Sequence, residues 1–542
     1  MSLTKAAAAE VAGRDVPVHK DAVGTLHAHC FRGLGRPAIC DAKFILEWNK
    51  TCDPRWRLSV DPGDLDDAAD APRGDGPGDE IKQRMELARH RCVDRELWDG
   101  DLPDFAEAWD EFKNSTGTVD FTDLIRMAID HDIPVPMGAD VLMVDEAQDL
   151  SRLEHVLIDR WAARSQGCIC VGDPYQALYT WRGAHPEALD TDHGEGRRRI
   201  LERSYRVPSA VLNASLRWIG DMIHERNAEL PPEQRAKIVS YLPRRLQDGS
   251  DAPGRVGTNH GSWRNPGPVI AAAEAFAAAG ESCMILASCS YQLTPTLAEL
   301  KKRGVPFSNP WRKKRGDWNP LSSAGATMTD RCKALMLGAG DAEEGGGWTW
   351  KTFWTWIKAV ATDGVIKHGM RAHTERQAKN HPDEPVTWMD VALVLIDPAP
   401  LRAMFEAASG HPKAGENLKS SFALPAREDP IFRRDLCAWY TARVSHQYDR
   451  AASYAAAVME RTADPKPLVY IGTIHSVKGA EAKHVLLYPD LSEAGASAWA
   501  SRGDGRASVY RTFYVGMTRA SESLTVCRAV SRGFAAPVWE AL

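Results

Sequence analysis

Short apolar segments alternate with helical segments in two separate regions of this 542-residue chain. The apolar segments have the length and composition of buried strands, and they lie at 141–144, 168–171, 469–472, 484–488 and 524–527. Between the first two, apolar residues recur at helical spacing from Leu153 to Trp161, and a further helix is expected near 513–520. Strands that alternate with helices form doubly wound parallel sheets. The sequence therefore predicts an α/β protein with two such sheets.

Composition places the chain among soluble globular proteins, because 44% of its residues are hydrophobic and 26% are charged. No run of 18 apolar residues occurs, so we expect no transmembrane helix and no membrane contact. The 11 cysteines are scattered without a Cys-x-x-Cys pair, which favours a reducing cytoplasm and argues against structural zinc. His27, His29 and Cys30 lie close together, but no second ligand pair follows them, and we predict no metal site there.

The net charge of −6 by itself gives no sign of a nucleic-acid partner. Much of this negative charge comes from one segment of the chain. Segment 61–80 holds eight acidic residues and one arginine, together with several Pro and Gly. Such a segment cannot bury apolar surface, and we expect a mobile surface loop. The rest of the chain is then close to neutral, which leaves room for basic patches.

An acidic pair directly follows the first predicted strand. Val141–Val144 leads into Asp145 and Glu146, an arrangement of the Walker B type. At the carboxyl end of a strand, Asp145 can bind Mg²⁺, and Glu146 can orient and deprotonate a water molecule that attacks a γ-phosphate. The alternative is an acidic loop that caps the next helix near Ser151. For an isolated Asp-Glu pair this alternative is the more common one.

The residues that follow favour the Walker B interpretation, because their order resembles a known family. Segment 145–149 (Asp-Glu-Ala-Gln-Asp) resembles motif II of superfamily 1 helicases of the UvrD/Rep/PcrA type. Segment 172–184, which includes Gly-Asp-Pro-Tyr-Gln and Trp-Arg-Gly-Ala, resembles their motif III. Segments resembling motifs Ia, Ib, IV, V and VI and a return motif lie at 2–10, 24–29, 204–206, 472–481, 514–520 and 120–124.

The resemblance implies two RecA-like domains of the P-loop NTPase type, with ATP and Mg²⁺ in the cleft between them and two mainly helical insertions. The implied division is core 1A at 1–33 and 120–200, insertion 1B at 34–119, core 2A at 201–310 and 431–542, and insertion 2B at 311–430.

The resemblance also assigns roles around the nucleotide. Gln176 would contact the γ-phosphate, while Arg206 and Arg519 would reach from the second domain and neutralise charge on the transferred phosphoryl group. An ordinary surface ion pair is the alternative for Arg519. The other implied ATP-binding residues are Tyr205 on the adenine, Glu481 on the ribose, Gly479 and Asp173.

Single-stranded DNA and its junctions with duplex are the partner that the family implies. Trp181 would stack on a base, a contact that contributes about 1–3 kcal/mol without sequence preference. A buried core tryptophan is the alternative, and a lone histidine is as often a packed or capping residue. The other implied DNA-binding residues are Tyr179, Thr25, His27, Thr473, His475 and Lys5.

One part of the family pattern is missing, because the sequence contains no G-x-x-x-x-G-K-[ST] loop. This Walker A loop cradles the phosphates and would precede motif Ia, which here begins at residue 2. Three explanations are open: a misassigned start or truncation, supply of the loop by another polypeptide, or a relative that does not hydrolyse ATP. We favour a missing or separately supplied segment, since loss of a central strand would expose apolar surface.

The sequence as a whole predicts an ATP-dependent translocase on single-stranded DNA that unwinds duplexes. Its motif III resembles the 3′-to-5′ branch of the superfamily, and this resemblance implies that polarity. The rival is a DNA-binding or accessory subunit without ATPase activity. Two segments stay outside this assignment. The basic segment 311–318 is as easily a solvated loop as a phosphate contact, and Trp350, Phe353, Trp354 and Ile357 follow the spacing of a helix core face.

Overall fold

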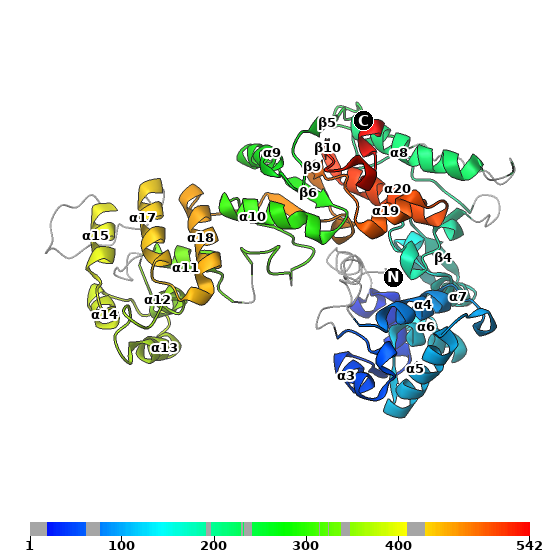
Figure 1. The fold of residues 1–542 in the computed structure, drawn as a ribbon, viewed down its shortest axis with the longest axis horizontal. Helices are drawn as coiled ribbons and strands as arrows, with labels where there is room; N and C mark the ends of the chain where they lie inside the picture. Colours follow the sequence, from blue (N-terminus) through cyan, green and yellow to red (C-terminus); the bar gives the residue numbers. More distant parts are fainter. Residues whose placement is uncertain are drawn as a thin grey trace.

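The computed structural model describes residues 19–60, 76–190, 197–228, 231, 241–313, 315–322, 325–337, 347–408 and 429–542. These residues form three bodies: a unit with a six-stranded sheet, a unit around α3 to α7, and a helical unit that holds α11 to α18 (Figure 1). The segment resembling motif Ia, including Lys5, lies outside the described residues, and so does most of the acidic segment 61–80.

The six-stranded sheet is entirely parallel, with strand order β5-β10-β9-β6-β8-β7. Its strands are β5 (Arg255–Asn259), β6 (Cys283–Ala287), β7 (Phe307–Ser308), β8 (Val469–Thr473), β9 (Ala482–Leu487) and β10 (Ala520–Cys527). Together with the helices beside them, these strands confirm the predicted α/β class. The helix expected near 513–520 is α20 (Asp504–Met517), which ends earlier because Ala520 already begins β10.

Both faces of this sheet are covered by helices. Met284 and Leu286 of β6 point into a core shared with α8 (Ser209–Ala228) and α20. Their neighbours Cys283 and Ile285 point into a second core with α9 (Gly267–Ala278) and α10 (Thr294–Lys302). Successive side chains of a strand face opposite ways, so apolar residues at every position of β6 follow directly from burial on both sides.

A second sheet contains only two parallel strands among the described residues, β3 (Val141–Val144) and β4 (Gly167–Cys170). One face packs on α2 (Leu26–Gly33), α6 (Phe121–Asp130) and α7 (Arg152–Ala162). The opposite face is open to solvent, with Met143 63% exposed and Ile169 50% exposed. The prediction of two parallel strands is confirmed, but the prediction that they are buried is wrong for this face.

A helical layer lies against the two-stranded unit. It comprises α3 (Ala42–Thr51), α4 (Asp79–His90) and α5 (Leu102–Thr116), whose shared core centres on Trp48 and Trp109. A short parallel pair, β1 (Ala38–Ile39) with β2 (Thr118–Val119), joins this layer to the neighbouring unit. Asp79 and Glu80 were expected in the acidic loop but form the first turn of α4, where carboxylates favour the amino end of a helix.

The third body is all-helical. Its elements are α11 (Met328–Leu335), α12 (Trp350–Ile357), α13 (Met370–Asn380), α14 (Trp388–Val394), α15 (Ala399–Ala408), α17 (Pro430–Thr441) and α18 (Asp449–Arg461). Trp350, Phe353 and Ile357 are buried in its core, which confirms these three positions of the predicted core face of α12, while Trp354 is partly buried against the core. Helix α17 belongs to this core as well, so the chain returns to the sheet unit later than residue 431.

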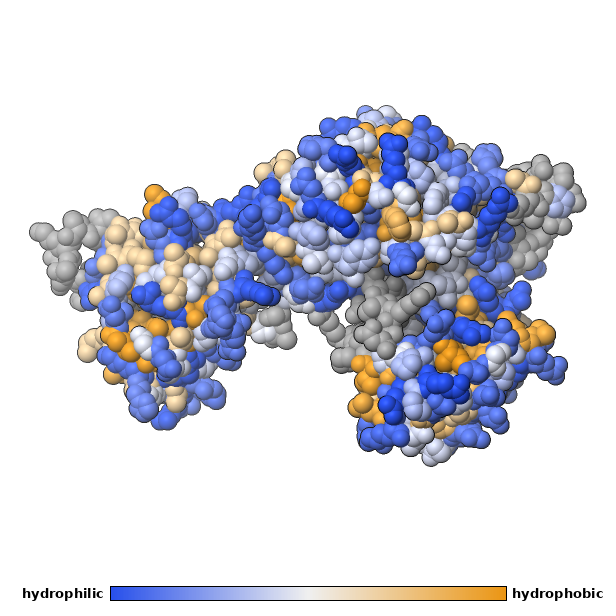
Figure 2. All heavy atoms as spheres, in the orientation of Figure 1, coloured by the Kyte–Doolittle hydropathy of each residue, from blue (hydrophilic) through white to orange (hydrophobic). Residues whose placement is uncertain are grey.

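The outer surface differs between the bodies. In the view of Figure 2, apolar surface gathers on the unit that holds α3 to α7, whereas the visible face of the six-stranded unit is mostly hydrophilic. Across the part of the chain that the structure describes, we find no helix with the length and apolar character needed to cross a membrane.

Candidate functional site

Two carboxylates stand at the carboxyl end of β3, where the two sheet units meet. Asp145 is exposed, and one of its oxygens accepts a hydrogen bond of 3.0 Å from the backbone N–H of Glu146. Glu146 has a φ of 57°, in the left-handed region that non-glycine residues seldom occupy. Such strain is typical of functional turns, and here it turns the Glu146 side chain towards the other unit.

Lys478 meets these carboxylates from the six-stranded unit. Its ammonium group lies 3.2 Å from Glu146 Oε2, contacts the buried carboxylate of Asp149 and donates to the carbonyl oxygen of Gln176 at 3.1 Å. Burial raises the pKa of Glu146, but Lys478 and a hydrogen bond from Gln148 outweigh it, so this pKa lies below its ordinary value. Glu146 is therefore ionised at neutral pH, as a general base requires.

A second contact between the units joins Gln176 and Arg519. Arg519 Nη2 donates to Gln176 Oε1 at 3.0 Å, across 343 residues of sequence. The arginine is 1% exposed, and its other nitrogens donate to the carbonyl oxygens of Val515 and Ala480. Burial and the neighbouring Arg206 both lower the pKa of Arg519. The sequence left open that Arg519 forms an ordinary surface ion pair. Its burial is not compatible with that alternative.

Arg206 lies beside Arg519 and has a buried nitrogen, Nε, without a hydrogen-bond partner. Burial lowers its pKa, and the carboxylates of Glu481 and Glu146 oppose this effect. Two adjacent guanidinium groups with an unsatisfied donor form an environment that favours an anion.

The four other residues predicted to bind ATP differ in exposure. Tyr205 is 93% exposed, so its ring is free to stack on a planar ligand. Glu481 and Gly479 are exposed at the same side of the cleft, and Gly479 has a φ of 83°. Asp173 instead accepts hydrogen bonds from Gln176 Nε2 and from the backbone N–H of Tyr175, at 2.8 and 2.9 Å. In this arrangement Asp173 positions Gln176.

The predicted DNA-binding aromatics lie in the loop that follows β4. Trp181 is 37% exposed, which leaves part of its ring accessible, and its environment is not that of a core tryptophan. Tyr179 is more enclosed, and the Lys478 ammonium lies 5.6 Å from the centre of its ring. Of the two, Trp181 has the geometry for stacking on a base.

The remaining predicted DNA contacts have structural partners. Thr25 caps α2 by accepting a hydrogen bond from the N–H of Ala28. Burial lowers the pKa of His27 to about 4, so this ring is uncharged at neutral pH. Thr473 is fully buried and accepts from the N–H of Ser476, whereas His475 is partly exposed. The structure therefore brings His475 to the surface but not Thr473.

Two residues that the sequence reasoning did not assign are Lys478 and Asp149. Both stand inside recognised motifs, Lys478 before Gly479 and Asp149 at the end of motif II. Burial raises the pKa of Asp149 to about 6, and Asp149 in turn helps raise the pKa of Lys478 above its ordinary value. The position of Lys478 inside a motif could have indicated a functional lysine. Its partner Asp149 could not be found from the sequence pattern, because it lies 329 residues away.

Two other clusters are explained by packing. In the basic segment 311–318, Trp318 is buried and Arg315 stacks over its ring at 4.0 Å. Glu281, His484 and Glu522 hold ligand atoms within 4.8 Å of one another, a spacing compatible with a metal ion. The ammonium of Lys483 already bridges both carboxylates, at 3.2 and 3.1 Å, and so takes the place of a cation.

Comparison with known proteins identifies one part of the chain. Residues 85–195 match the UvrD/REP helicase N-terminal domain. The chain is 30% identical over 131 residues to the ATP-dependent DNA helicase PcrA of Leuconostoc citreum, an alignment that covers 22% of this chain and 17% of that protein. It is 28% identical over 136 residues to the ATP-dependent DNA helicase Rep of Buchnera aphidicola subsp. Baizongia pistaciae, covering 23% of this chain and 20% of that protein.

A third relative gives a similar result. The PcrA helicase of Staphylococcus aureus (strain Mu50 / ATCC 700699) is 29% identical over 125 residues, which cover 21% of this chain and 16% of that helicase. The matched part of the chain thus spans about a fifth of the length of these relatives or less. It contains motifs II and III, so the predicted resemblance to UvrD-type superfamily 1 helicases is confirmed there.

Proposed function

We propose that this chain, a UvrD-type superfamily 1 helicase by its motif II and III region, couples Mg²⁺-ATP hydrolysis to movement along single-stranded DNA and to duplex unwinding. The observation that carries the proposal is the meeting of Glu146, Gln176, Arg206 and Arg519 across the two sheet units. These are the groups needed to activate a water molecule and to stabilise charge on a phosphoryl group.

The residues present fit a bound nucleotide in several respects. The unpaired Nε of Arg206 and the buried Arg519 would neutralise phosphate charge, and the exposed Asp145 would bind Mg²⁺. When bound, Mg²⁺ would neutralise phosphate oxygens and orient them for attack. Tyr205 and Glu481 would hold the adenine and ribose, while Asp173 keeps Gln176 in place.

The chain's own sequence supplies no phosphate-cradling loop, and the open face of β3–β4 offers a place for one. Met143 and Ile169 point outward there beside Asp145. Parallel strands are normally covered on both faces, and both outer edges of this pair are unpaired among the described residues. We therefore propose that a further strand, paired along one of these edges, and a phosphate loop complete the nucleotide site beside Asp145, and that they come from a preceding segment or from an accessory polypeptide.

Single-stranded DNA would run past Trp181 and His475, the two predicted DNA contacts with accessible side chains. Bound ATP would stabilise the contact between the units that Gln176 and Arg519 form, and hydrolysis would weaken it. The proposed 3′-to-5′ polarity rests on the resemblance of motif III.

Titration with a fluorescent ATP analogue and Mg²⁺, with and without single-stranded DNA, tests the nucleotide site. We expect weak binding by the chain alone and tight binding once a P-loop segment is joined or added. Failure of both forms to bind would refute the proposed ATPase. Reading the coding sequence upstream for an in-frame P-loop identifies which form to prepare.

Glu146→Gln tests the chemistry in the form that binds ATP. Removal of a general base typically lowers turnover by about 10²–10⁴-fold. We expect DNA-stimulated hydrolysis to fall in that range while DNA affinity, measured by fluorescence anisotropy, stays within twofold. Glu47→Gln, a change to an exposed glutamate of α3, is the matched control and should leave hydrolysis unchanged. Equal turnover in the two variants would contradict the role of Glu146.

A second function is favoured by the position of Lys478. Its ammonium already neutralises the carboxylates of Glu146 and Asp149, so these two acidic groups are paired without Mg²⁺ or a nucleotide. This state fits a DNA-binding or accessory subunit that does not hydrolyse ATP. Tight Mg²⁺-ATP binding in the titration above would exclude this second function, and DNA binding without any nucleotide affinity would favour it.

A further inference from the structure

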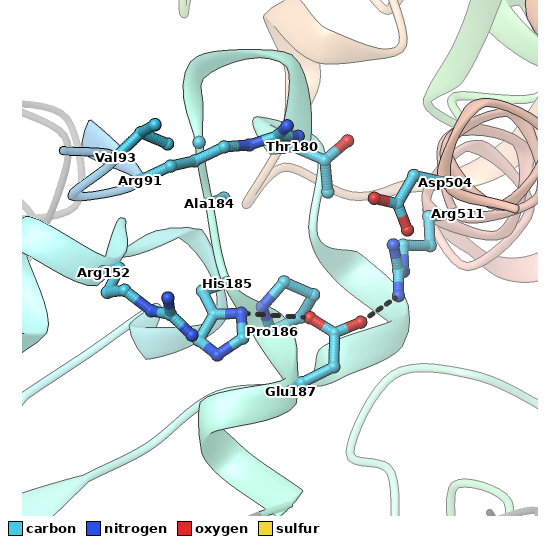
Figure 3. Close-up of a pocket in the computed structure, with 11 residues that line it drawn as sticks. Arg91, Val93, Arg152, Thr180, Ala184, His185, Pro186, Glu187, Asp504 and Arg511 are labelled. Carbon is cyan, nitrogen blue, oxygen red and sulfur yellow. Dashed lines mark hydrogen bonds and ion pairs between the residues drawn. The ribbon is translucent and has the colours of Figure 1, made fainter. Parts of the chain in front are cut away.

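A cavity of about 310 Å³ lies at the junction of four elements, away from the predicted nucleotide cleft. It is lined by the end of α4, the start of α7, the loop 180–187 and the first half of α20 (Figure 3). The first three elements belong to the two-stranded unit and its helical layer, while α20 belongs to the six-stranded unit. Its volume is at the lower end of the range for ligand sites.

Three arginines face this cavity. Arg91 and Arg152 lie on one side and Arg511 lies on the other (Figure 3). The side chains of Arg91 and Arg152 are in exposed positions and make no hydrogen bond or ion pair with any residue that the structure describes. Two free guanidinium groups that line one cavity form a site of positive potential.

Arg511 is the buried member of the set. Its side chain is 6% exposed, and its Nε atom is buried without a hydrogen-bond partner. One bond of 3.4 Å, from Nη2 to Glu187 Oε1, is the hydrogen bond that the structure gives this side chain. A buried guanidinium with an unsatisfied donor is costly unless a ligand completes its hydrogen bonds.

The acidic residues of the cavity do not cancel this charge. Glu187 is shared among several partners: it contacts Arg511 and, at 3.5 Å, His185 (Figure 3), and Arg226 lies 3.4 Å from the same carboxylate. Asp504 is the other carboxylate, and it stands in the first turn of α20. The N-cap of α20 is Gly503, which has no side chain to bond the free N–H groups of that turn.

We propose that this junction cavity binds a phosphate group, held by Arg91, Arg152 and Arg511. Guanidinium groups bind phosphate oxygens through paired N–H donors, which suits both a backbone phosphate of single-stranded DNA and a free phosphate ion. The DNA source rests on the proposed function, and it places a strand contact beside Trp181 of the same loop. Because the arginines come from both units, a bound phosphate ties the units together.

Binding of a labelled oligo-dT 20-mer, followed by fluorescence anisotropy at several salt concentrations, tests the DNA source. Each phosphate contact contributes about 0.7 to the slope of log affinity against log salt for single strands. For the double variant Arg91→Ala/Arg152→Ala we expect this slope to fall by about 0.7, because the site holds one phosphate. Arg152→Lys keeps the charge and should keep most of its share of the slope.

Arg376→Ala is the matched control, since Arg376 is an exposed arginine of α13 in the separate helical unit. Circular dichroism and thermal unfolding confirm that each variant is folded. Arg91 and Arg152 are exposed, so their replacement should not affect folding, and buried Arg511 is left intact.

Inorganic phosphate separates the two sources. Thermal unfolding of the wild type and of the double variant is compared over increasing phosphate, against chloride at the same ionic strength. A phosphate-dependent rise in Tm in the wild type only, with an unchanged DNA slope, would support the site and assign it to a small anion. If neither the DNA slope nor the phosphate response differs from that of Arg376→Ala, the proposal is overturned. If the wild type binds no DNA at all, the proposed function fails, while the phosphate experiment still decides the site.

Discussion

The two parallel sheets of this protein are built from similar apolar strands, but only one of them is covered on both faces. In the six-stranded sheet, Ile285 is fully buried between helical layers. In the β3–β4 pair, Ile169 occupies a strand of the same kind and is 50% exposed. An apolar run in a strand therefore indicates that a covering layer exists or is required, but not which segment supplies that layer.

The comparison also shows how each unit is held together. The six-stranded unit relies on two apolar cores. Both units also hold buried polar groups, and in the two-stranded unit these include a charged cluster around Asp120, which caps α6 and accepts from Arg89 and Lys113 at 2.9 and 2.8 Å. The predicted site lies between the two, so its geometry depends on both kinds of stabilisation.

Acid is expected to produce the largest difference between the units. Burial lowers the pKa of His27, His29 and His90, all in the two-stranded unit and its helical layer, to about 4. Since these pKa values are about 6.5 in the unfolded chain, the unfolded state binds more protons below that pH. The contribution of these histidines to the free energy of unfolding is therefore fully present above pH 6.5. It falls towards pH 4 by about 1.4 kcal/mol per pH unit for each histidine.

Hydrogen exchange at pH 7 and pH 5 measures this effect locally. We expect exchange in α2, α6 and α7 to accelerate at pH 5, after correction for intrinsic rates, more than exchange in β6 and β9. His90→Gln should remove one histidine's share of the pH dependence. Equal protection of α2 at both pH values would contradict the prediction.

Lys478→Ala should weaken the connection between the units. The change leaves the 1%-exposed Asp149 carboxylate without its cation, and loss of one partner of a buried pair costs about 3–5 kcal/mol. Urea unfolding gives the free energy of unfolding. The control is Lys379→Ala, which breaks an exposed pair with Glu375 and should cost below about 0.5 kcal/mol.

A double variant sharpens this prediction. Asp149→Asn with Lys478→Ala removes the buried charge together with its partner, and we expect it to recover part of the lost stability. A loss no greater for Lys478→Ala than for Lys379→Ala would show that the contact does not hold the units together.

The same substitution in the two sheets gives the most direct comparison and the smallest effects. Ile285→Ala should cost about 2–5 kcal/mol, because it opens a cavity in a close-packed core. Ile169→Ala removes a half-exposed side chain and should cost below about 1 kcal/mol. Hydrogen exchange of β6 and β4 reports each change in its own sheet. Similar losses of stability in the two variants would mean that Ile169 is covered in solution.

The sequence predicted the local features well and the exposed faces poorly. The spacing of Trp350, Phe353 and Ile357 gave the correct buried face of α12, because a helix places such positions on one side. The predicted burial of β3 and β4 was wrong for one face, since apolar residues on both faces do not show which segment supplies the covering layer. His27 was weighed as a DNA contact, and its burial follows from the docking of α2 against Phe121 of α6.

By itself, the sequence determined the alternation of strands and helices, the helix caps and the order of the motifs, because these depend on residues close together in the chain. The tertiary structure decided which side chains meet. Lys478 with Asp149, Arg519 with Gln176, and Arg511 with Glu187 are each separated by more than 300 residues. Contacts of this kind form when separately built units dock, and their charges become strong interactions only where docking excludes water.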